Sequence, residues 1–470
     1  MNVNTIEIKN YRCFRNLEVT FHDQLTVLIA PNGGGKSTVL DALAYMLSVF
    51  VGKFDKAIPQ KPDKGESDKP QRQEPNPEDV RVIRKEDMGR IPVHPSLIEL
   101  SFCTDVLRGK QASCRVLAGE ILAVEDGLFD AAKAMVRVLH SERPSAAVTL
   151  PIVAYYGSKR TISLDEFKVG PDLGNAALMR PDGYAGSLTA SANANLFRTW
   201  YGKAAIGELS VQQKLSKNQP VAPSERKLAE RARAVKEVVN LILGGASEQP
   251  RFWLDLFLSM NQVGVLDSEQ NVELGLHQLS DGVQSMLSLA GDLAARCAVL
   301  NPHFGADAPA NTPGVVLIDE VDLHLHPAWQ QRVLVDLQRA FPLVQFIVTT
   351  HSPQVLTSVR RENIRLLTTD GQAITPDDGT YGAESSRVLE DVFGVHSRPP
   401  EYVFSSHPAQ MGCKNPVADL RKYLALVESD KASTPEAVEL RASLEDALGK
   451  HDPDLKLADI RASQIKVLGR

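Results

Sequence analysis

The chain has 470 residues, of which 43% are hydrophobic and 23% charged, and its formal net charge is −6. This composition supplies a sizeable core, and the length predicts about three domains of ~150 residues, although one nucleotide domain with insertions also fits. The charge argues against a chain-wide basic surface for nucleic acid but leaves room for a local patch. Five cysteines without a Cys-x-x-Cys pair suit a reducing compartment. With no apolar run of ~18 residues and no signal-peptide pattern, we expect a cytoplasmic protein without membrane contact.

The N-terminal part predicts strands around a glycine-rich turn. Residues 5–9 and 17–21 alternate apolar and polar side chains, and 25–30 form a continuous apolar run typical of a buried strand. Residues 37–50 have an apolar stripe at helical spacing. The following stretch, 53–95, is rich in proline and charge, which predicts an irregular insertion.

The rest of the chain predicts strands alternating with helices. Further strand signals lie at 96–102, 114–119, 150–157, 314–320 and 346–352. We expect a helical insertion at 191–274, one helix from Pro327 to Ala340, and a small helical C-terminal region at 396–470. Strands that alternate with helices favour an α/β fold whose largely parallel sheet is covered on its faces.

A phosphate-binding loop is predicted at 30–38, which reads APNGGGKST between a buried strand and a helix. Glycines let backbone N–H groups approach a phosphate, and the helix N-terminus adds partial positive charge. Lys36 would reach the β- and γ-phosphates, and the Ser37 hydroxyl would bind Mg²⁺. Ala30 replaces the first glycine of the motif, so we expect binding to survive and leave the hydrolysis rate open. The nucleotide-binding candidates in this loop are Asn32, Gly33, Gly34, Gly35, Lys36, Ser37 and Thr38.

Two carboxylates and a histidine follow later strands. Asp319 ends an apolar strand, where it could hold Mg²⁺ directly or through water. Glu320 is next, and is the candidate to orient or deprotonate the attacking water. His351 ends another strand and could hydrogen-bond the γ-phosphate or the water. The alternative interpretation is that Asp319 and Glu320 are solvated acids at a strand end. The presence of a phosphate loop in the same chain favours the magnesium and water roles over it.

The segment 279–284, LSDGVQ, opens a predicted helix and forms a second candidate anion site through Ser280 and Gly282. An ordinary serine-capped helix start is the alternative. Because one nucleotide site already has its phosphate loop, a second phosphate-binding helix start suggests use against the nucleotide of another chain.

Other polar clusters favour structural interpretations. His324 and His326 are two residues apart without an obvious third ligand, so a turn before a proline-started helix is preferred over a metal site. A run of basic residues at helical spacing is more often a solvated face than a DNA contact. These residues are Arg226, Lys227, Arg231, Arg233 and Lys236.

Taken together, the motifs resemble those of ABC-type ATPases. The opening IEIKNYRCF, which runs straight into the phosphate loop, is similar to the RecF/SMC-related branch, and the resemblance is strong over 1–50 and 275–355. It implies an ABC-type P-loop head with a mixed sheet flanked by helices, divided into 1–190 and 275–395. It also implies ATP and Mg²⁺ as cofactors and a homodimer, or a higher even oligomer, that sandwiches ATP. Ser280 and Gly282 would serve the opposite subunit, with Asp322 near the dimer seam.

Within this branch the chain most resembles the Septu-type anti-phage ATPases, including their retron-associated versions, on the segment VLEDVFGVHSRPPE at 388–401. The resemblance implies a separate HNH-type nuclease subunit, bound through 396–470, and possible contact with DNA or retron nucleic acid. A nuclease within this chain is not expected, because Asp452-Pro453-Asp454 lies between helical segments with no strand before it. A RecF-like DNA-repair ATPase and an ATP-binding scaffold with little hydrolysis stay open as alternatives.

Overall fold

The computed structural model describes most of the chain in segments. The described residues are 1–55, 97–104, 111–117, 120–124, 127–139, 148–158, 178–189, 196–245, 251–257, 262–368, 370–401, 403 and 415–468. The irregular insertion predicted at 53–95 therefore lies outside the described residues, apart from its first three, which end a helix.

A six-stranded sheet forms the centre of the larger unit, in the order β14-β13-β3-β12-β11-β7. Its strands are β3 (Leu25–Ile29), β7 (Ile152–Tyr156), β11 (Gly314–Ile318), β12 (Val344–Thr349), β13 (Ile364–Leu367) and β14 (Ala373–Ile374). All pairs are parallel except β13 with β14. Every residue of β3, β7, β11 and β12 is buried, as expected for parallel strands covered on both faces. The prediction of a largely parallel sheet is confirmed.

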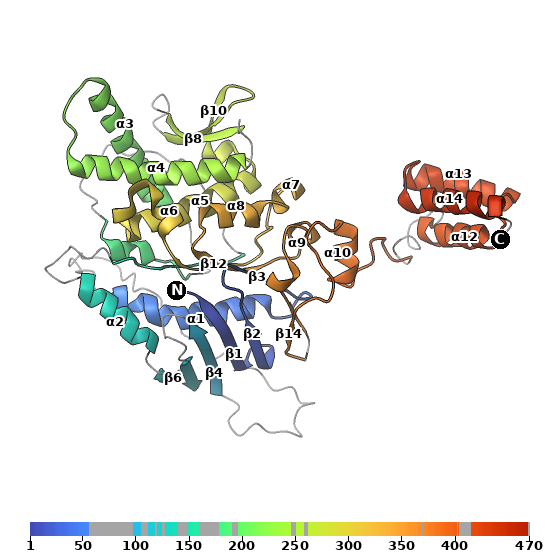
Figure 1. Ribbon diagram of the computed structural model, residues 1–470, viewed down its shortest axis with the longest axis horizontal. Coiled ribbons are helices and arrows are strands. Elements are labelled where there is room, and N and C mark those ends of the chain that lie inside the picture. The colour runs from blue at the N-terminus through green and yellow to red at the C-terminus, as the bar shows by residue number, and fades with distance from the viewer. Residues whose placement is uncertain are drawn as a thin grey trace. The chain divides into compact units, whose positions relative to one another are not determined.

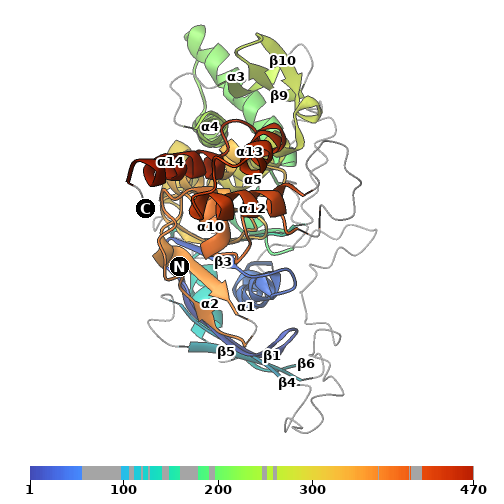
Figure 2. The ribbon, with the colours of Figure 1, turned by 90° about the vertical axis from the view of Figure 1, so that its right-hand side faces the viewer.

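A second, antiparallel sheet has the order β2-β1-β4-β5-β6. It contains β1 (Val3–Tyr11), β2 (Phe14–Thr20), β4 (Leu97–Thr104), β5 (Gln111–Leu117) and β6 (Glu120–Val124). Helix α1 (Lys36–Asp55) lies between the two sheets and packs on strands of both, with α2 (Gly127–Leu139) beside it (Figures 1 and 2). The helix that starts in the phosphate loop is thus held from two sides.

The opposite face of the six-stranded sheet is covered by α5 (Asp281–Leu300), with α4 (Pro223–Gly244) packed on it (Figure 1). By length and composition alone, α1 and α5 could each cross a membrane. However, 67% and 89% of their apolar windows are buried inside the fold, as is usual for core helices.

The segment 191–274 differs from its prediction. It contains α3 (Gly202–Ser216) and α4, but its end forms an antiparallel sheet in the order β10-β9-β8. These strands are β8 (Phe252–Phe257), β9 (Gln262–Asp267) and β10 (Val272–Gly275). The wholly helical prediction was wrong there because short alternating runs such as FWLDLF carry a two-residue period.

The helix predicted from Pro327 to Ala340 is two helices, α7 (Pro327–Gln330) and α8 (Val333–Ala340). Arg332 lies between them, and its guanidinium donates to the carbonyls of Ile242 and Leu243 at the end of α4, at 3.0 and 3.1 Å. The remaining short helices of this unit are α6 (Ala308–Asn311) and α9 (Pro353–Leu356).

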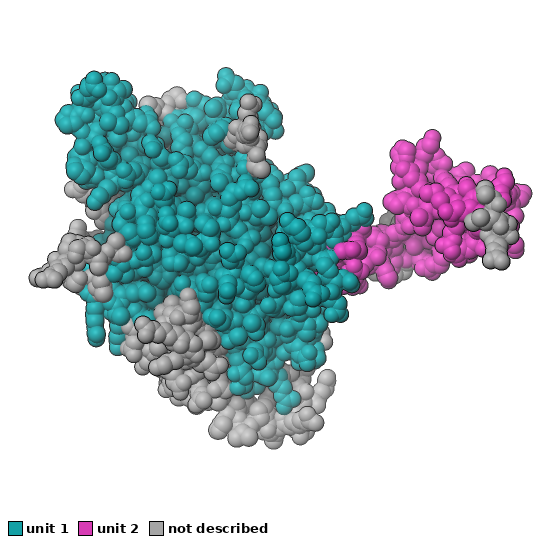
Figure 3. Space-filling view, in the orientation of Figure 1, with its two compact units in different colours: residues 1–385 teal, residues 386–470 magenta. Residues whose placement is uncertain are grey.

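The chain divides into two compact units, 1–385 and 386–470 (Figure 3), and α10 (Ser385–Asp391) begins at the division. Besides most of α10, the described residues of the second unit include α12 (Pro416–Glu428), α13 (Pro435–Leu448) and α14 (Pro453–Leu468). Their facing side chains form a small core of Leu420, Tyr423, Val427, Ala437, Leu444, Leu455 and Ala458. The helical content predicted for the C-terminal region is confirmed for these residues.

The Asp452-Pro453-Asp454 segment has a structural role in this second unit. Asp452 Oδ1 accepts from the N–H groups of Asp454 and Leu455, which caps α14. The Arg398 guanidinium donates to both carboxylates, at 2.9 and 2.6 Å. Both acids are therefore occupied in holding the helix start, as the linker interpretation anticipates.

Candidate nucleotide-binding site

The loop 30–38 has the backbone that a phosphate loop needs. Gly33 and Gly35 have φ angles of 77° and 87°, which L-residues rarely adopt. A Cβ on Gly35 would lie 2.5 Å from a ring carbon of Phe14 and 2.6 Å from Cys13 Sγ. Ala30 is not among the described non-glycine residues with positive φ, so its Cβ causes no backbone strain. Alanine thus fits at this position.

Lys36 is 7% exposed and lies over its own loop, where Nζ donates to the carbonyls of Ala30 at 2.9 Å and Pro31 at 3.4 Å. Burial lowers the pKa of Lys36, and the carboxylates of three acids counteract that effect. These acids are Asp319, Glu320 and Asp322. The ammonium group and the carboxylates of the later strand end therefore share one site.

The Ser37 hydroxyl donates to Asp319 Oδ2 at 2.8 Å. Two oxygens bound at neighbouring positions of octahedral Mg²⁺, each at about 2.0–2.1 Å, lie about 2.9 Å apart. The two oxygens predicted to hold the metal thus already have the required separation. Thr349 Oγ1 donates to Asp319 Oδ1 at 2.5 Å and fixes the carboxylate from its other side.

Glu320 has a φ of 48°, in the left-handed region that costs a non-glycine residue about 1–2 kcal/mol. Two hydrogen bonds hold this backbone, from Glu320 N to Thr349 Oγ1 at 2.7 Å and from Val321 N to Thr349 O at 2.9 Å. Strain maintained by surrounding contacts is frequent at functional sites.

Asp322 and His351 belong to the same edge of the sheet. Thr350 Oγ1 donates to Asp322 Oδ1 at 2.5 Å and accepts from Ser352 N at 3.0 Å. His351 lies between Thr350 and Ser352 in the chain, and it is exposed. The histidine is therefore presented at the end of β12 by neighbours that are themselves fixed.

The start of α5 lies against the turn that follows Asp322. Ser280 is exposed, and its hydroxyl does not cap its own helix, which leaves the first-turn N–H groups open to an anion. A Cβ on Gly282 would lie 2.5 Å from His324 O, so only glycine permits this approach. The described contacts bring Ser280 and Gly282 to the Asp322–His324 turn, and none of them joins these residues to Lys36.

The histidines of this turn follow the structural interpretation. His324 has a φ of 62°, and His326 Nδ1 accepts from Ala328 N at 3.3 Å, which caps α7. The described part of the chain contains no group of three or more His, Cys, Asp or Glu arranged for a metal ion. A magnesium site here would therefore use Ser37 and Asp319 together with phosphate oxygens.

Sequence reasoning missed the turn between β1 and β2, which lies on the phosphate loop. Cys13 Sγ lies 3.9 Å from Thr38 Oγ1. Arg12, which has a φ of 50°, makes an ion pair with Asp41 on α1. Thr349 and Thr350 were also missed. The hydroxyl pair directly before His351 is the signal that could have revealed them.

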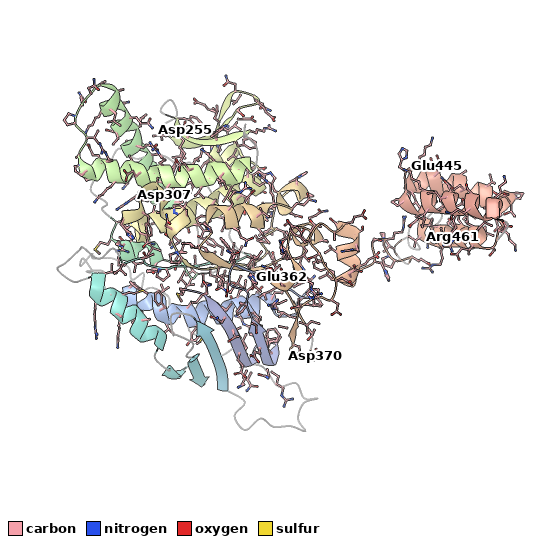
Figure 4. The ribbon with its side chains drawn as sticks, viewed as in Figure 1. Asp255, Asp307, Glu362, Asp370, Glu445 and Arg461 are labelled. Carbon is pink, nitrogen blue, oxygen red and sulfur yellow. The ribbon has the colours of Figure 1, made fainter. Side chains whose placement is uncertain are left out.

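The basic residues of α4 do not form one uniform face. Arg226, Lys227 and Arg233 are exposed, but burial lowers the pKa of Arg231. Lys236 makes a 2.9 Å ion pair with Asp255. Asp255 lies on β8 and is labelled in Figure 4. This mixture agrees better with a partly solvated structural helix than with a phosphate-binding surface.

Two parts of the chain match models of known protein families. Residues 1–92 match the family model described as an AAA ATPase domain. Residues 161–357 match the model described as "AAA domain, putative AbiEii toxin, Type IV TA system". Both models describe AAA-type domains, and the chain is similar to ATPases of this type over the matched residues. The predicted α/β fold with a mixed sheet flanked by helices is confirmed.

Several named proteins are similar to this chain. The "Retron Ec83 probable ATPase" of Escherichia coli is 28% identical, over 97% of this chain and 85% of the relative. The "Septu protein PtuA" of Bacillus mycoides strain KBAB4 is 44% identical over 78 residues, or 17% of this chain and 10% of the relative. A solved SMC head bound to the C-winged helix domain of ScpA has a TM-score of 0.42 and 14% identity, over 79% of this chain and 96% of that one.

Replacement of Gly35 tests the loop geometry. We expect Gly35→Ala to weaken ATP binding by at least about tenfold, because the new Cβ meets Phe14 and Cys13 and the residue would hold a positive φ. The measurement is ATP affinity by calorimetry. Gly52→Ala on α1 is the control, since its Cβ would meet nothing within 4 Å, and its affinity should equal that of the unaltered protein. Equal affinities for both variants would contradict this account of the loop.

Proposed function

We propose that this ATPase binds and hydrolyses ATP with Mg²⁺ between two copies of itself, and that it thereby controls a separate nuclease in anti-phage defence. The observation that carries the nucleotide part is the contact between Ser37 on the phosphate loop and Asp319 at the end of β11, beside buried Lys36. Residues 282 positions apart meet there with the chemistry that a magnesium-bound triphosphate requires.

Each residue has a definite task in this proposal. Lys36 exchanges its loop carbonyls for the β- and γ-phosphates, and the loop N–H groups bind the remaining oxygens. Ser37 and Asp319 would hold Mg²⁺, which neutralises phosphate charge when it is bound. Glu320 is the candidate base for the attacking water, and His351 the candidate contact to the γ-phosphate.

A second copy would complete the site. The open N-terminus of α5 at Ser280 is an anion site without a phosphate in its own chain, and it lies beside the turn that carries Asp322. In a head-to-tail pair this surface would cover the nucleotide held by Lys36 of the other copy. We propose a homodimer, or an even oligomer built from such pairs, as the active form.

The defence role rests on the relatives. One matching relative is named as a retron ATPase and another as a Septu protein, and the first is similar over nearly the whole chain. We propose that the helical unit within 396–470 is where an HNH-type nuclease subunit binds. Contact with DNA or retron nucleic acid is part of the same proposal. A cytoplasmic location is also part of this proposal.

The scaffold alternative, ATP binding with little hydrolysis, was suggested by Ala30. Its ordinary backbone conformation and its carbonyl contact with Lys36 remove that reason. The basic residues of α4 do not form one face, so they give no support to DNA contact through this helix, whether in defence or in repair.

Substitution of Glu320 should affect turnover, whereas substitution of Lys36 should affect ATP binding. We expect Glu320→Gln to bind ATP with unaltered affinity, to lose at least about a hundredfold in turnover, and to accumulate as an ATP-bound dimer, because phosphate contacts remain while water activation is lost. Lys36→Ala should bind ATP weakly and stay monomeric. Phosphate release and light scattering measure both effects. Normal turnover by Glu320→Gln would remove Glu320 from this role.

The sharing of the site between chains can be tested by mixing. Ser280→Arg should bind ATP but not dimerise, since a bulky cation blocks the exposed helix start. A mixture of Ser280→Arg with Lys36→Ala can form one composite site from the intact Lys36 loop of the first and the intact Ser280 start of the second. We expect partial recovery of turnover on mixing. Additive activities without recovery would show that each site works within one chain.

The partner is tested by purification from the native host. We expect a small HNH-type nuclease to co-purify with the unaltered protein, as identified by mass spectrometry, and to be lost when residues 396–470 are removed. The shortened chain should keep its ATP affinity, because the second unit has its own core. DNA-stimulated turnover without any bound protein would favour the repair role instead.

A further inference from the structure

Strand β7 ends in two adjacent tyrosines that contact helices on opposite faces of the sheet, as successive strand residues do. Tyr155 donates its hydroxyl to Asp41 Oδ1 on α1 at 2.9 Å. Tyr156 donates its hydroxyl to Asp292 Oδ2 on α5 at 2.7 Å. Helix α1 begins at Lys36, and α5 begins directly after Ser280. One strand end therefore contacts both helices whose N-termini are the candidate phosphate sites.

The backbone of Tyr156 also contacts the candidate metal residue. Tyr156 pairs with Ile318 in the parallel register, and its carbonyl accepts from Asp319 N at 2.8 Å. Tyr156 is thus bonded to the Asp319 strand end through its main chain and to α5 through its side chain.

Asp292 and Arg296 form a buried charged pair inside α5, with exposed fractions of 0% and 2%. Asp292 Oδ2 accepts from both Tyr156 and Arg296 Nε, the latter at 2.7 Å. Arg296 also donates to the carbonyls of Gly183 and Ala185. Within the described residues, Asp292 Oδ1 is buried without a hydrogen-bond partner.

Such a network is a poor way to gain stability. Apolar side chains of similar volume are often as stable as a buried ion pair, and a partly satisfied carboxylate is costly. A buried group that stays incompletely paired calls for an explanation other than packing. Burial and the Asp292 carboxylate raise the pKa of Tyr156 well above its ordinary value, so the hydroxyl remains a donor across the working pH range.

Helix α5 can carry a change at Asp292 to its own start. Asp292 lies twelve residues after the N-cap Ser280, which corresponds to a rise of about 18 Å along one continuous helix. Every residue from Ser285 to Leu300 is buried, so the helix moves as a packed rod. Rotation of Asp292 relative to β7 would therefore displace the Ser280 end.

We propose that Tyr156 is a positioning residue that sets the Ser280 helix start relative to the Asp319 strand end. In this arrangement the α5 start is correctly aimed at a second copy only when the site formed by Lys36 and Asp319 is properly assembled. The inference deepens the proposed function and rests on it, since it assigns the coupling between the two phosphate-binding helices of one chain to a single hydroxyl.

The test is Tyr156→Phe, with Tyr184→Phe as a matched control. Tyr184 is also buried and donates its hydroxyl at 2.7 Å, but to the carbonyl of Pro151 and not to a side chain of α5. We expect Tyr156→Phe to keep the ATP affinity of the single chain within about twofold. Its turnover, and its ATP-dependent dimerisation in the Glu320→Gln background, should each fall roughly tenfold, the effect of one lost hydrogen bond. Tyr184→Phe should change neither.

Hydrogen exchange gives a second, independent measurement. Amides of the first turn of α5 should exchange faster in Tyr156→Phe than in Tyr184→Phe, while the amides of α1 exchange equally in both. Equal turnover in the two variants would overturn the inference. So would unfolding of Tyr156→Phe alone, since that would make the hydroxyl a stability contact. An unaltered chain that does not hydrolyse ATP would instead overturn the proposed function, which keeps the two failures distinguishable.

Discussion

The arrangement depends on a buried carboxylate, Asp319, at the carboxyl edge of a parallel sheet. A charged group that is 3% exposed is stable only when its oxygens are bonded, and Ser37 and Thr349 supply those bonds. Because each comes from a different strand end or helix start, the carboxylate fixes β11, β12 and the phosphate loop relative to one another. The site is thus a consequence of satisfying one acid, and the same hydroxyl–carboxylate pair has the spacing of two magnesium ligands.

The turn that follows this acid relates the two halves of the site. Glu320 adopts a strained backbone, and the residues after it reach the start of α5, where Gly282 allows His324 O to approach. A larger residue at 282 would separate the helix start from the turn. The exposed surface with Ser280 and the catalytic edge with Asp319 are therefore built from one continuous stretch of backbone contacts, although they face different nucleotides in the proposed dimer.

The sequence predicted the parts of the site that are local. A continuous apolar strand, a glycine run and Lys36 at the helix start specify a phosphate loop without reference to the rest of the chain. The contact of Thr349 with Asp319 joins residues 30 positions apart, and that of Tyr156 with Asp292 joins residues 136 positions apart. A hydroxyl side chain at a strand end belongs to no sequence pattern from which its partner could be predicted. The β8–β10 sheet was missed because its strands are short and follow a long helix, whose period dominated the prediction.

The charge of the site explains why ATP would bind to it together with Mg²⁺. Lys36 is surrounded by the fields of three carboxylates, so the site without nucleotide has an excess of negative charge. ATP alone would add more of the same sign, and only Mg²⁺ and the N-terminal dipole of α1 can offset it within one chain. The open start of α5 supplies another partial positive charge, and the nearest neighbour of a Cβ on Gly282 there is His324 O. In the proposed dimer, a second copy would be attracted once a metal-bound triphosphate gives that helix start an anion to bind, and association would then depend on nucleotide.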